Sequence, residues 1–394
     1  MRDATVNSGY NRAVLLLSAS GFAASVSLRS MDTLLPSLAA DFGVTVGQAS
    51  YVITAYALGY GACQLAAGLI GDRFGKFQLI LTLCILSAAA TALSSLASSL
   101  SQLVAARMLA GMVASGIVPL AMAWIGDQIP MEQRQAVMAR YMGGIISGTL
   151  LGQVIGGILA QNVGWRMTTL VFAMGFLIVA AALFAESRNV QKRAHKEAAS
   201  SGPGLLQNLR SIRNNPYALT ILAGVAIEGV AIFGVLTFTG ASLHLRFGLG
   251  LGWVGGMLAC FALGGLLYST MVGALLRRFH RVALIRAGGI LLALGLMALG
   301  FSPVVWIMPF AIMAMGVGFY LIHNPLQVHA TQILPSARGT GVALFATVLF
   351  LAQSLGVAIG APLVDAGGLW PICMASACIM SVTGFWLARQ IGNR

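Results

Sequence analysis

The sequence predicts an all-α membrane protein in which twelve transmembrane helices form two pseudo-symmetric six-helix bundles. This prediction depends on the apolar composition, the placement of basic residues and an internal repeat. The chain has 394 residues, of which 58% are hydrophobic and only 8% are charged, whereas about a quarter of the residues are charged in an ordinary soluble domain. Too few charges are present to cover a water-soluble fold of this size, so the expected solvent is a bilayer.

Twelve apolar segments are long enough to cross a membrane, which takes about 20 predominantly apolar residues per helix. They are rich in Gly, Ala and Ser, and small residues let helices approach closely in lipid. The predicted spans are 13–40, 48–70, 77–98, 102–125, 137–161, 166–185, 217–241, 252–273, 282–301, 304–328, 341–364 and 370–388.

Basic residues are distributed unequally between the two sides of the predicted membrane. Nineteen of the 23 Lys and Arg residues lie in the tails and in one set of alternate loops, two lie in the opposite loops (Arg166 and Arg246), and two lie within spans (Arg29 and Arg107). The positive-inside rule then places both termini in the cytoplasm of a bacterium, with the chain in its inner membrane, and requires an even number of spans. The formal charge of +13 therefore reflects topology, and no nucleic-acid partner is expected.

An internal repeat divides the chain at its midpoint. GLIGDRFGKFQLI at 68–80 aligns with GALLRRFHRVALI at 273–285, an offset of 205 positions, and further glycines recur at offsets of 204 and 205. Residues 1–187 and 216–394 are predicted to be the two bundles. Residues 188–215 are basic and polar, and we expect a cytoplasmic linker there, with a short interfacial helix around 205–212. Duplicated halves around a midplane site are typical of secondary transporters.

The loop after the second span carries a specific motif. It reads Gly68-Leu-Ile-Gly-Asp72-Arg73-Phe-Gly75-Lys76 and resembles the G-x-x-x-D-[RK]-x-G-[RK] signature of the major facilitator superfamily. Its degenerate copy after span eight is also typical of that family, and the resemblance covers the whole chain. It implies a transporter that works by alternating access.

Two further motifs resemble the twelve-span drug:proton antiporter branch of that family. Span four carries Leu103-x-x-x-Arg107-x-x-x-Gly111, similar to a motif of proton-coupled members. Span five carries a glycine-rich antiporter-like pattern in which Gln153 replaces the usual Pro. The resemblance implies proton-coupled efflux of small amphipathic compounds. The replaced Pro leaves open the alternative of a proton symporter that imports an organic acid or another small nutrient.

Charged residues around the signature loop predict a gate. Asp72 is an acid among bases, at a helix end where a carboxylate can meet an arginine or the N-terminus of another helix. A cytoplasmic cluster that breaks during the transport cycle is expected, although topological anchoring by the bases alone would also explain them. The predicted gating residues are Gly68, Asp72, Arg73, Gly75, Lys76, Asp127 and Arg134.

Charged residues inside the spans are candidates for proton coupling. Asp32 and Glu228 lie within apolar runs, where a charge costs roughly 2.5–3.5 kcal/mol on insertion scales and usually faces a cavity or a partner. Arg29 lies three residues before Asp32, on the same helical face, so the two can pair. Arg107 needs a buried carboxylate or backbone partner, and Asp32 is a candidate. Each of the four could instead be purely structural.

Polar and titratable side chains elsewhere in the spans are candidates for binding a substrate. His323 and Asn324 precede a proline in span ten, and histidine titrates near neutral pH. Interhelical hydrogen bonding is the alternative role for the whole set. The predicted substrate-binding residues are Tyr56, Tyr60, Gln64, Gln153, Glu228, His323, Asn324 and Gln353.

Several other functions are not indicated by the sequence. It has no Walker motif, and its five cysteines lack metal-site spacing. No cleavable signal peptide is predicted, because the first apolar run is too long. We therefore expect no cofactor, no metal and no enzymatic activity. The expected partners are a small-molecule substrate, protons and the lipid bilayer, and the expected state is a monomer.

Overall fold

The computed structural model describes residues 3–193, 212–334 and 338–391. The side chains of residues 3–9, 68–70, 72–74, 191–193 and 338 are outside this description. Within these ranges the chain is helical and contains no β-strand. The predicted all-α membrane fold is confirmed.

The N-terminal half begins with a long helix, α1, and its connections are short. Positive φ angles at Gly43 (63°) and Gly75 (88°) allow tight turns there, because glycine has no Cβ to clash in that region. The helices are α1 (Asp3–Phe42), α2 (Val46–Ala49), α3 (Tyr51–Phe74), α4 (Lys76–Ser95), α5 (Leu100–Ala114), α6 (Ile117–Gln128) and α7 (Met131–Arg193).

The C-terminal half begins at Pro216, where the Asn215 side chain accepts hydrogen bonds from the first free backbone N–H groups of the helix. Its first span is interrupted by a π-helical turn. The elements are α9 (Pro216–Glu228), η1 (Gly229–Phe233), α10 (Gly234–Phe247), α11 (Leu251–Arg278), α12 (Arg281–Phe301), η2 (Val305–Ile307), α13 (Met308–Ala330), α14 (Arg338–Gly367) and α15 (Trp370–Ile391).

The described residues contain all twelve predicted crossing segments. Ten helical stretches among them are long and apolar enough to span a membrane. One of these, α7, holds two spans, because its backbone leaves helical geometry at Gly164 (φ 78°, ψ 165°). The 24-residue α3 is the remaining segment. Span four, expected as one unbroken helix, is divided into α5 and α6 at Ser115–Gly116.

The boundary between the halves differs in detail from the expectation. Helix α7 continues to Arg193, past residue 188 where the linker is predicted to begin. The predicted interfacial helix at 205–212 lies almost wholly outside the described residues.

The repeat in the sequence is also a repeat in the packing. Gly111 of α5 lies directly against the Tyr56 carbonyl of α3, and Gly316 of α13 lies directly against the Phe261 carbonyl of α11. Both residues of the second pair are 205 positions after those of the first. At each site a Cβ would collide with a neighbouring backbone, so glycine is needed for this close approach.

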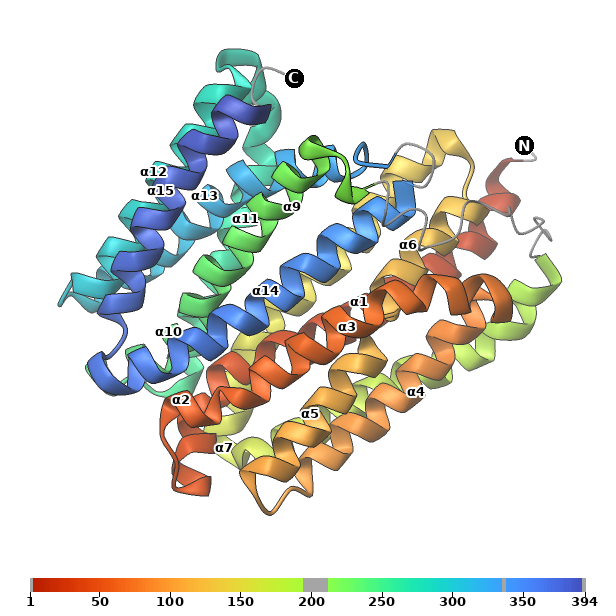
Figure 1. The fold of residues 1–394 in the computed structure, drawn as a ribbon. Helices are drawn as coiled ribbons and strands as arrows, with labels where there is room; N and C mark the ends of the chain where they lie inside the picture. The colour runs from red at the N-terminus through yellow and green to blue at the C-terminus, as the bar shows by residue number, and fades with distance from the viewer. Residues whose placement is uncertain (1–2, 194–211, 335–337, 392–394) are drawn as a thin grey trace.

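Among the described residues, one hydrophobic cluster contains buried residues of both halves, and its N-terminal members lie mostly toward one end of the molecule. Residues 31–53, around the α1–α3 connection, share a hydrophobic cluster with the C-terminal half. Residues 13–24, nearer the start of α1, belong to a separate cluster of the N-terminal half. In Figure 1, α14 and α3 lie side by side at the boundary, and the start of α1 and the end of α15 lie at the same end of the bundle. We call this the basic end, and the end with the α1–α3 connection the outer end.

Candidate functional site

A buried acid–base pair lies inside the C-terminal half. Glu228 ends α9, His323 comes from α13, and the Glu228 Oε2 atom is 2.9 Å from the His323 Nδ1 atom. The glutamate is fully buried and the histidine is 8% exposed. Within the described residues the other carboxylate oxygen, Oε1, has no hydrogen-bond partner. The predicted proton-coupling residue and a predicted substrate-binding residue are therefore direct partners.

The backbone next to Glu228 has unusual geometry. The turn Gly229–Phe233 is π-helical, and π-turns within α-helices frequently occur at functional sites. Gly229 lies against the Leu349 carbonyl and Ala352 of α14, so the neighbouring helix approaches without a side chain between them. The π-turn therefore begins directly after Glu228, at a close contact with α14.

A second buried pair lies in the N-terminal half. The Arg29 Nη1 atom is 3.7 Å from the Asp32 Oδ2 atom, and the Asp32 side chain is 1% exposed. The predicted pairing of these two residues on one helical face is confirmed. The Arg29 guanidinium also lies 4.4 Å from the centre of the Phe233 ring, in the π-turn of the other half.

Aromatic rings connect the two buried pairs across the boundary between the halves. Phe233 lies 5.6 Å from Phe319 in an edge-to-face arrangement, and Phe319 stacks on the His323 ring at 4.6 Å. The contact chain runs from Arg29 through both phenylalanines to His323 and then Glu228. The sequence analysis did not select Phe233 or Phe319, because apolar rings within a span give no signal that separates them from ordinary core.

The hydrogen-bond partner of Arg107 is a backbone carbonyl, one of the two kinds expected, and not the carboxylate of Asp32. Arg107 donates from Nη2 to the Ser27 carbonyl oxygen at 2.8 Å and lies 4.3 Å from the centre of the Tyr56 ring. The expected partner, Asp32, accepts no hydrogen bond from it, and both Asp32 oxygens lack one within the described residues. A backbone carbonyl and an aromatic face therefore satisfy this buried cation in place of a carboxylate.

Most of the other predicted substrate-binding residues are buried. The Tyr60 ring lies 4.3 Å from Phe350 of α14, and Asn324 is half-buried. Several polar atoms of the predicted set have no hydrogen-bond partner among the described residues, namely Tyr56 Oη, Gln64 Oε1, Gln153 Oε1 and both terminal atoms of Gln353. Buried polar groups are normally paired, so these unpaired atoms are candidates for hydrogen bonds to a substrate. Access of Asp32 and Glu228 to a cavity remains a prediction, since both are sealed here.

The gating motif is described in part. Lys76 forms an ion pair with Asp127 across 2.8 Å, which joins two of the predicted residues. Arg134 instead donates to the Ile129 carbonyl oxygen at 3.3 and 3.2 Å. The side chains of Gly68, Asp72 and Arg73 are outside the described residues, so their place in the cluster remains a prediction.

A polar contact closes the outer end between the halves. Asp365, near the end of α14, accepts hydrogen bonds from the Thr45 hydroxyl at 2.6 Å and from the Gly47 N–H at 2.8 Å. Thr45 also caps α2 together with Gln48. The sequence analysis did not identify Asp365, because it lies near the end of a predicted span, where acids are common.

The repeat places a second contact of the same kind between the other pair of helices. Gln161 of α7 accepts a hydrogen bond from the Gly252 N–H at 3.2 Å. Gly252 follows Gly47 by 205 positions, and Asp365 follows Gln161 by 204. The two outer contacts are therefore copies of one another, with a carboxylate in one and an amide in the other. The repeat offset was the signal that could have located both.

These features define a class of protein. Two duplicated helical bundles that meet around buried charges, and that contact each other at one end, form a membrane transporter rather than an enzyme. The family model of the Major Facilitator Superfamily matches residues 17–357. The chain belongs to this superfamily.

Relatives and solved structures agree with that placement. A chloramphenicol resistance protein of Streptomyces lividans is 29% identical over 66% of this chain, and the match covers 65% of that relative, slightly under two thirds of its length. A putative uncharacterized transporter of Escherichia coli is 26% identical over 94% of this chain and 93% of its own. The inward-facing, unoccupied structure of a bacterial homolog of the human lysosomal transporter Spinster superposes with a TM-score of 0.80, at 16% identity and 98% coverage of both chains.

Proposed function

We propose that the protein is a proton-coupled exporter of small amphipathic compounds that works by alternating access. The observation that carries this proposal is the pair of buried charged groups, Arg29–Asp32 and Glu228–His323, one in each half and connected through Phe233 and Phe319. Uncompensated charge is costly inside a membrane, and acids kept there usually belong to ion or proton pathways.

The pairs offer a physical route to coupling. His323 contacts Glu228 through one ring nitrogen, and protonation of the Glu228 carboxylate would change the net charge of this pair. Arg29 stays charged, so protonation of Asp32 would leave an unbalanced cation beside Phe233. Either event changes the interactions across the boundary between the halves. A change of charge therefore becomes a change in the relative stability of two conformations.

The distribution of contacts supports alternating access. The two polar outer contacts, at Asp365 and at Gln161, hold the halves together at one end. One hydrophobic cluster contains buried residues of both halves there, whereas the buried residues of the second cluster all belong to the N-terminal half. By the positive-inside rule the basic end is cytoplasmic, and the conformation described is then closed toward the outside. Export requires these outer contacts to break and contacts at the basic end to form.

The nature of the cargo is proposed from the boundary residues and a relative. Tyr56, Tyr60 and Phe350 offer aromatic surface, and Gln64 and Gln353 offer unpaired polar atoms. This combination suits a compound with both apolar and polar groups. The relative named as a chloramphenicol resistance protein makes chloramphenicol the first compound to test.

The test is transport in proteoliposomes with an imposed pH gradient. Purified protein is reconstituted, and movement of radiolabelled chloramphenicol and of ethidium is followed with the gradient in either direction. We expect movement of at least one compound opposite to the proton flux, and collapse of that movement when an uncoupler dissipates the gradient. Movement that is insensitive to both gradient and uncoupler would refute proton coupling.

One specific observation supports the alternative of a symporter. Two arginines, Arg29 and Arg107, are buried, and Arg107 has an Nε atom with no partner within the described residues. Such a site also suits a carboxylate. Proton-driven accumulation of an organic acid in the same proteoliposomes, with protons and substrate moving together, would favour this alternative.

A further inference from the structure

The basic end of the C-terminal half carries arginines and no acids. From Pro216 to the end of the chain the only acidic residues are Glu228 and Asp365. Glu228 is in the buried pair, and Asp365 is at the outer end. The arginines in or near the loops at the basic end of this half, among the described residues, are Arg277, Arg278, Arg281, Arg286, Arg338 and Arg389.

The equivalent end of the N-terminal half has acids that pair with some of its bases. Lys76 pairs with Asp127 at 2.8 Å, and Arg12 pairs with Glu186 at 3.3 Å. The repeat makes the contrast direct, because Asp72 of the first half corresponds to Arg277 of the second. In the first half, carboxylates of the protein itself neutralise some of the basic side chains. In the second half, an anion that neutralises the arginines has to come from outside the chain.

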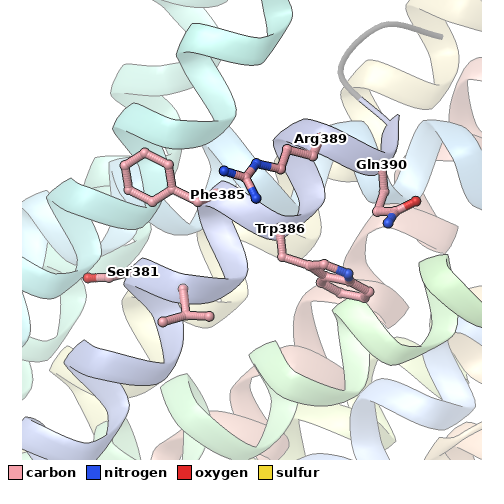
Figure 2. A pocket seen from close by; sticks show the side chains of 6 residues that line it. Ser381, Phe385, Trp386, Arg389 and Gln390 are labelled. Carbon is pink, nitrogen blue, oxygen red and sulfur yellow. The ribbon is translucent and has the colours of Figure 1, made fainter.

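A hollow of about 450 Å³ lies along α15 at this end. Its lining residues follow one face of the helix: Ser381, Val382, Phe385, Trp386, Arg389 and Gln390. Val382 is 69% exposed and Phe385 is 43% exposed, so apolar surface continues from the hollow toward the middle of the span. Figure 2 shows Phe385 and Arg389 near each other on the helix, with Trp386 and Gln390 on its adjoining face.

A second arginine, on the neighbouring helix, lies near one of the lining residues. The Arg286 guanidinium of α12 lies 5.8 Å from the centre of the Phe385 ring. Among the described residues no carboxylate lies within ion-pair distance of either Arg286 or Arg389. Two arginines therefore lie near Phe385, Arg286 on α12 and Arg389 one turn further along α15 (Figure 2).

We propose that this hollow binds an anionic glycerophospholipid. The phosphate group would lie between Arg286 and Arg389, with Gln390 as a further donor, and an acyl chain would lie along Phe385 and Val382. Basic pockets on the cytoplasmic side of transmembrane helices are suited to anionic lipid head groups, and indole rings prefer the membrane–water interface. The lipid supplies the negative charge that this half of the protein lacks.

Quenching of tryptophan fluorescence by brominated lipid tests the proposal at the hollow itself. The protein is reconstituted in vesicles containing either brominated phosphatidylglycerol or brominated phosphatidylcholine. The contribution of Trp386 is obtained by subtracting the signal of Trp386→Phe, since five other tryptophans are present. We expect phosphatidylglycerol to quench Trp386 more strongly than phosphatidylcholine does, and millimolar inorganic phosphate not to remove the difference.

Variants assign the preference to the two arginines. In the double variant Arg286→Gln, Arg389→Gln, the two lipids should quench Trp386 equally. The variant Arg286→Lys, Arg389→Lys should keep much of the preference, which would show that substitution at these positions does not by itself unfold the protein. Arg140→Gln removes one exposed arginine from the basic end of the other half and should keep the preference. Equal quenching by the two lipids in the unmodified protein, or an undiminished preference in the double Gln variant, would overturn the proposal.

Discussion

The N-terminal half buries an arginine–aspartate pair, Arg29 with Asp32, whereas the C-terminal half buries a histidine–glutamate pair, Glu228 with His323. The two halves share a packing scheme, since equivalent glycines make equivalent close contacts. Their buried charges are nevertheless unrelated, because Leu236 and Ala24 occupy the positions equivalent to Asp32 and Glu228. Duplication preserved the scaffold, and each half acquired its own ionisable site.

The difference in chemistry has a consequence for stability. Arginine cannot lose its charge in a protein, so the loss of Asp32 leaves a buried cation without a counter-ion. Histidine as a residue type can be neutral near physiological pH, so the loss of the Glu228 charge need not leave a buried cation without a counter-ion. The N-terminal pair should therefore matter most for stability, and the C-terminal pair most for proton exchange.

The largest effect is expected from Glu228→Gln. The amide can still hydrogen-bond to His323 but cannot carry a proton, so transport driven by a pH gradient should fall to the level of protein-free liposomes while ligand binding survives. Flux in proteoliposomes checks the loss of transport, and a thermal-shift measurement checks that binding survives. Glu186→Gln is the matched control, a buried carboxyl paired with Arg12 away from the boundary. Unchanged coupling in Glu228→Gln would remove the residue from the mechanism.

The next effect concerns the other pair. Asp32→Asn should destabilise the folded protein by roughly 3–5 kcal/mol, as expected when one partner of a buried ion pair is removed. The double variant Arg29→Met, Asp32→Leu should recover most of that loss, since no buried charge remains, and should still fail in proton-driven transport. Thermal unfolding in detergent measures the stabilities. If Glu228→Gln proved as destabilising as Asp32→Asn, the distinction between the two pairs would be lost.

A smaller effect is expected at the outer end, where the two halves supply equivalent contacts. In Gly47→Ala the added methyl group would meet Asp365 and the Ala361 carbonyl, and overpacking of this kind costs roughly 1–3 kcal/mol. The penalty applies only while the outer contact is formed, so the substitution should shift the population toward an outward-open state. Distances between spin labels on outer loops, with and without the substitution, measure the shift. Gly126→Ala is the control, because nothing lies near the added Cβ there.

The smallest effect is expected from Asp127→Asn, which removes the ion pair with Lys76. Both side chains are partly exposed, and exposed pairs contribute about 0.2–1 kcal/mol. Stability should hardly change, while turnover should slow if the pair helps to close the basic end during the cycle. Initial transport rates at saturating substrate measure this. Normal turnover would indicate that the pair serves only to anchor the loop.

Much of the architecture could be predicted from the sequence, but the partners of the buried charges could not. Helix lengths, the duplication and the Arg29–Asp32 pair follow from local spacing, because residues three apart share a helical face. Glu228 and His323 are 95 positions apart, and no local pattern connects them. Arg107 illustrates the same limit, since its carbonyl partner at Ser27 has no side-chain signal at all.

The sequence by itself determined that this protein lies in a membrane, that it is duplicated, and that charges are kept within its spans. These properties depend on composition, periodicity and repeat offsets, which the bilayer constrains directly because every spanning backbone must satisfy its own hydrogen bonds. Only the tertiary structure decided which charge meets which, where the π-turn falls, and which end of the molecule is closed. Those outcomes depend on contacts between helices that are distant in the chain. Burial and close packing select one partner among several that the local sequence does not distinguish.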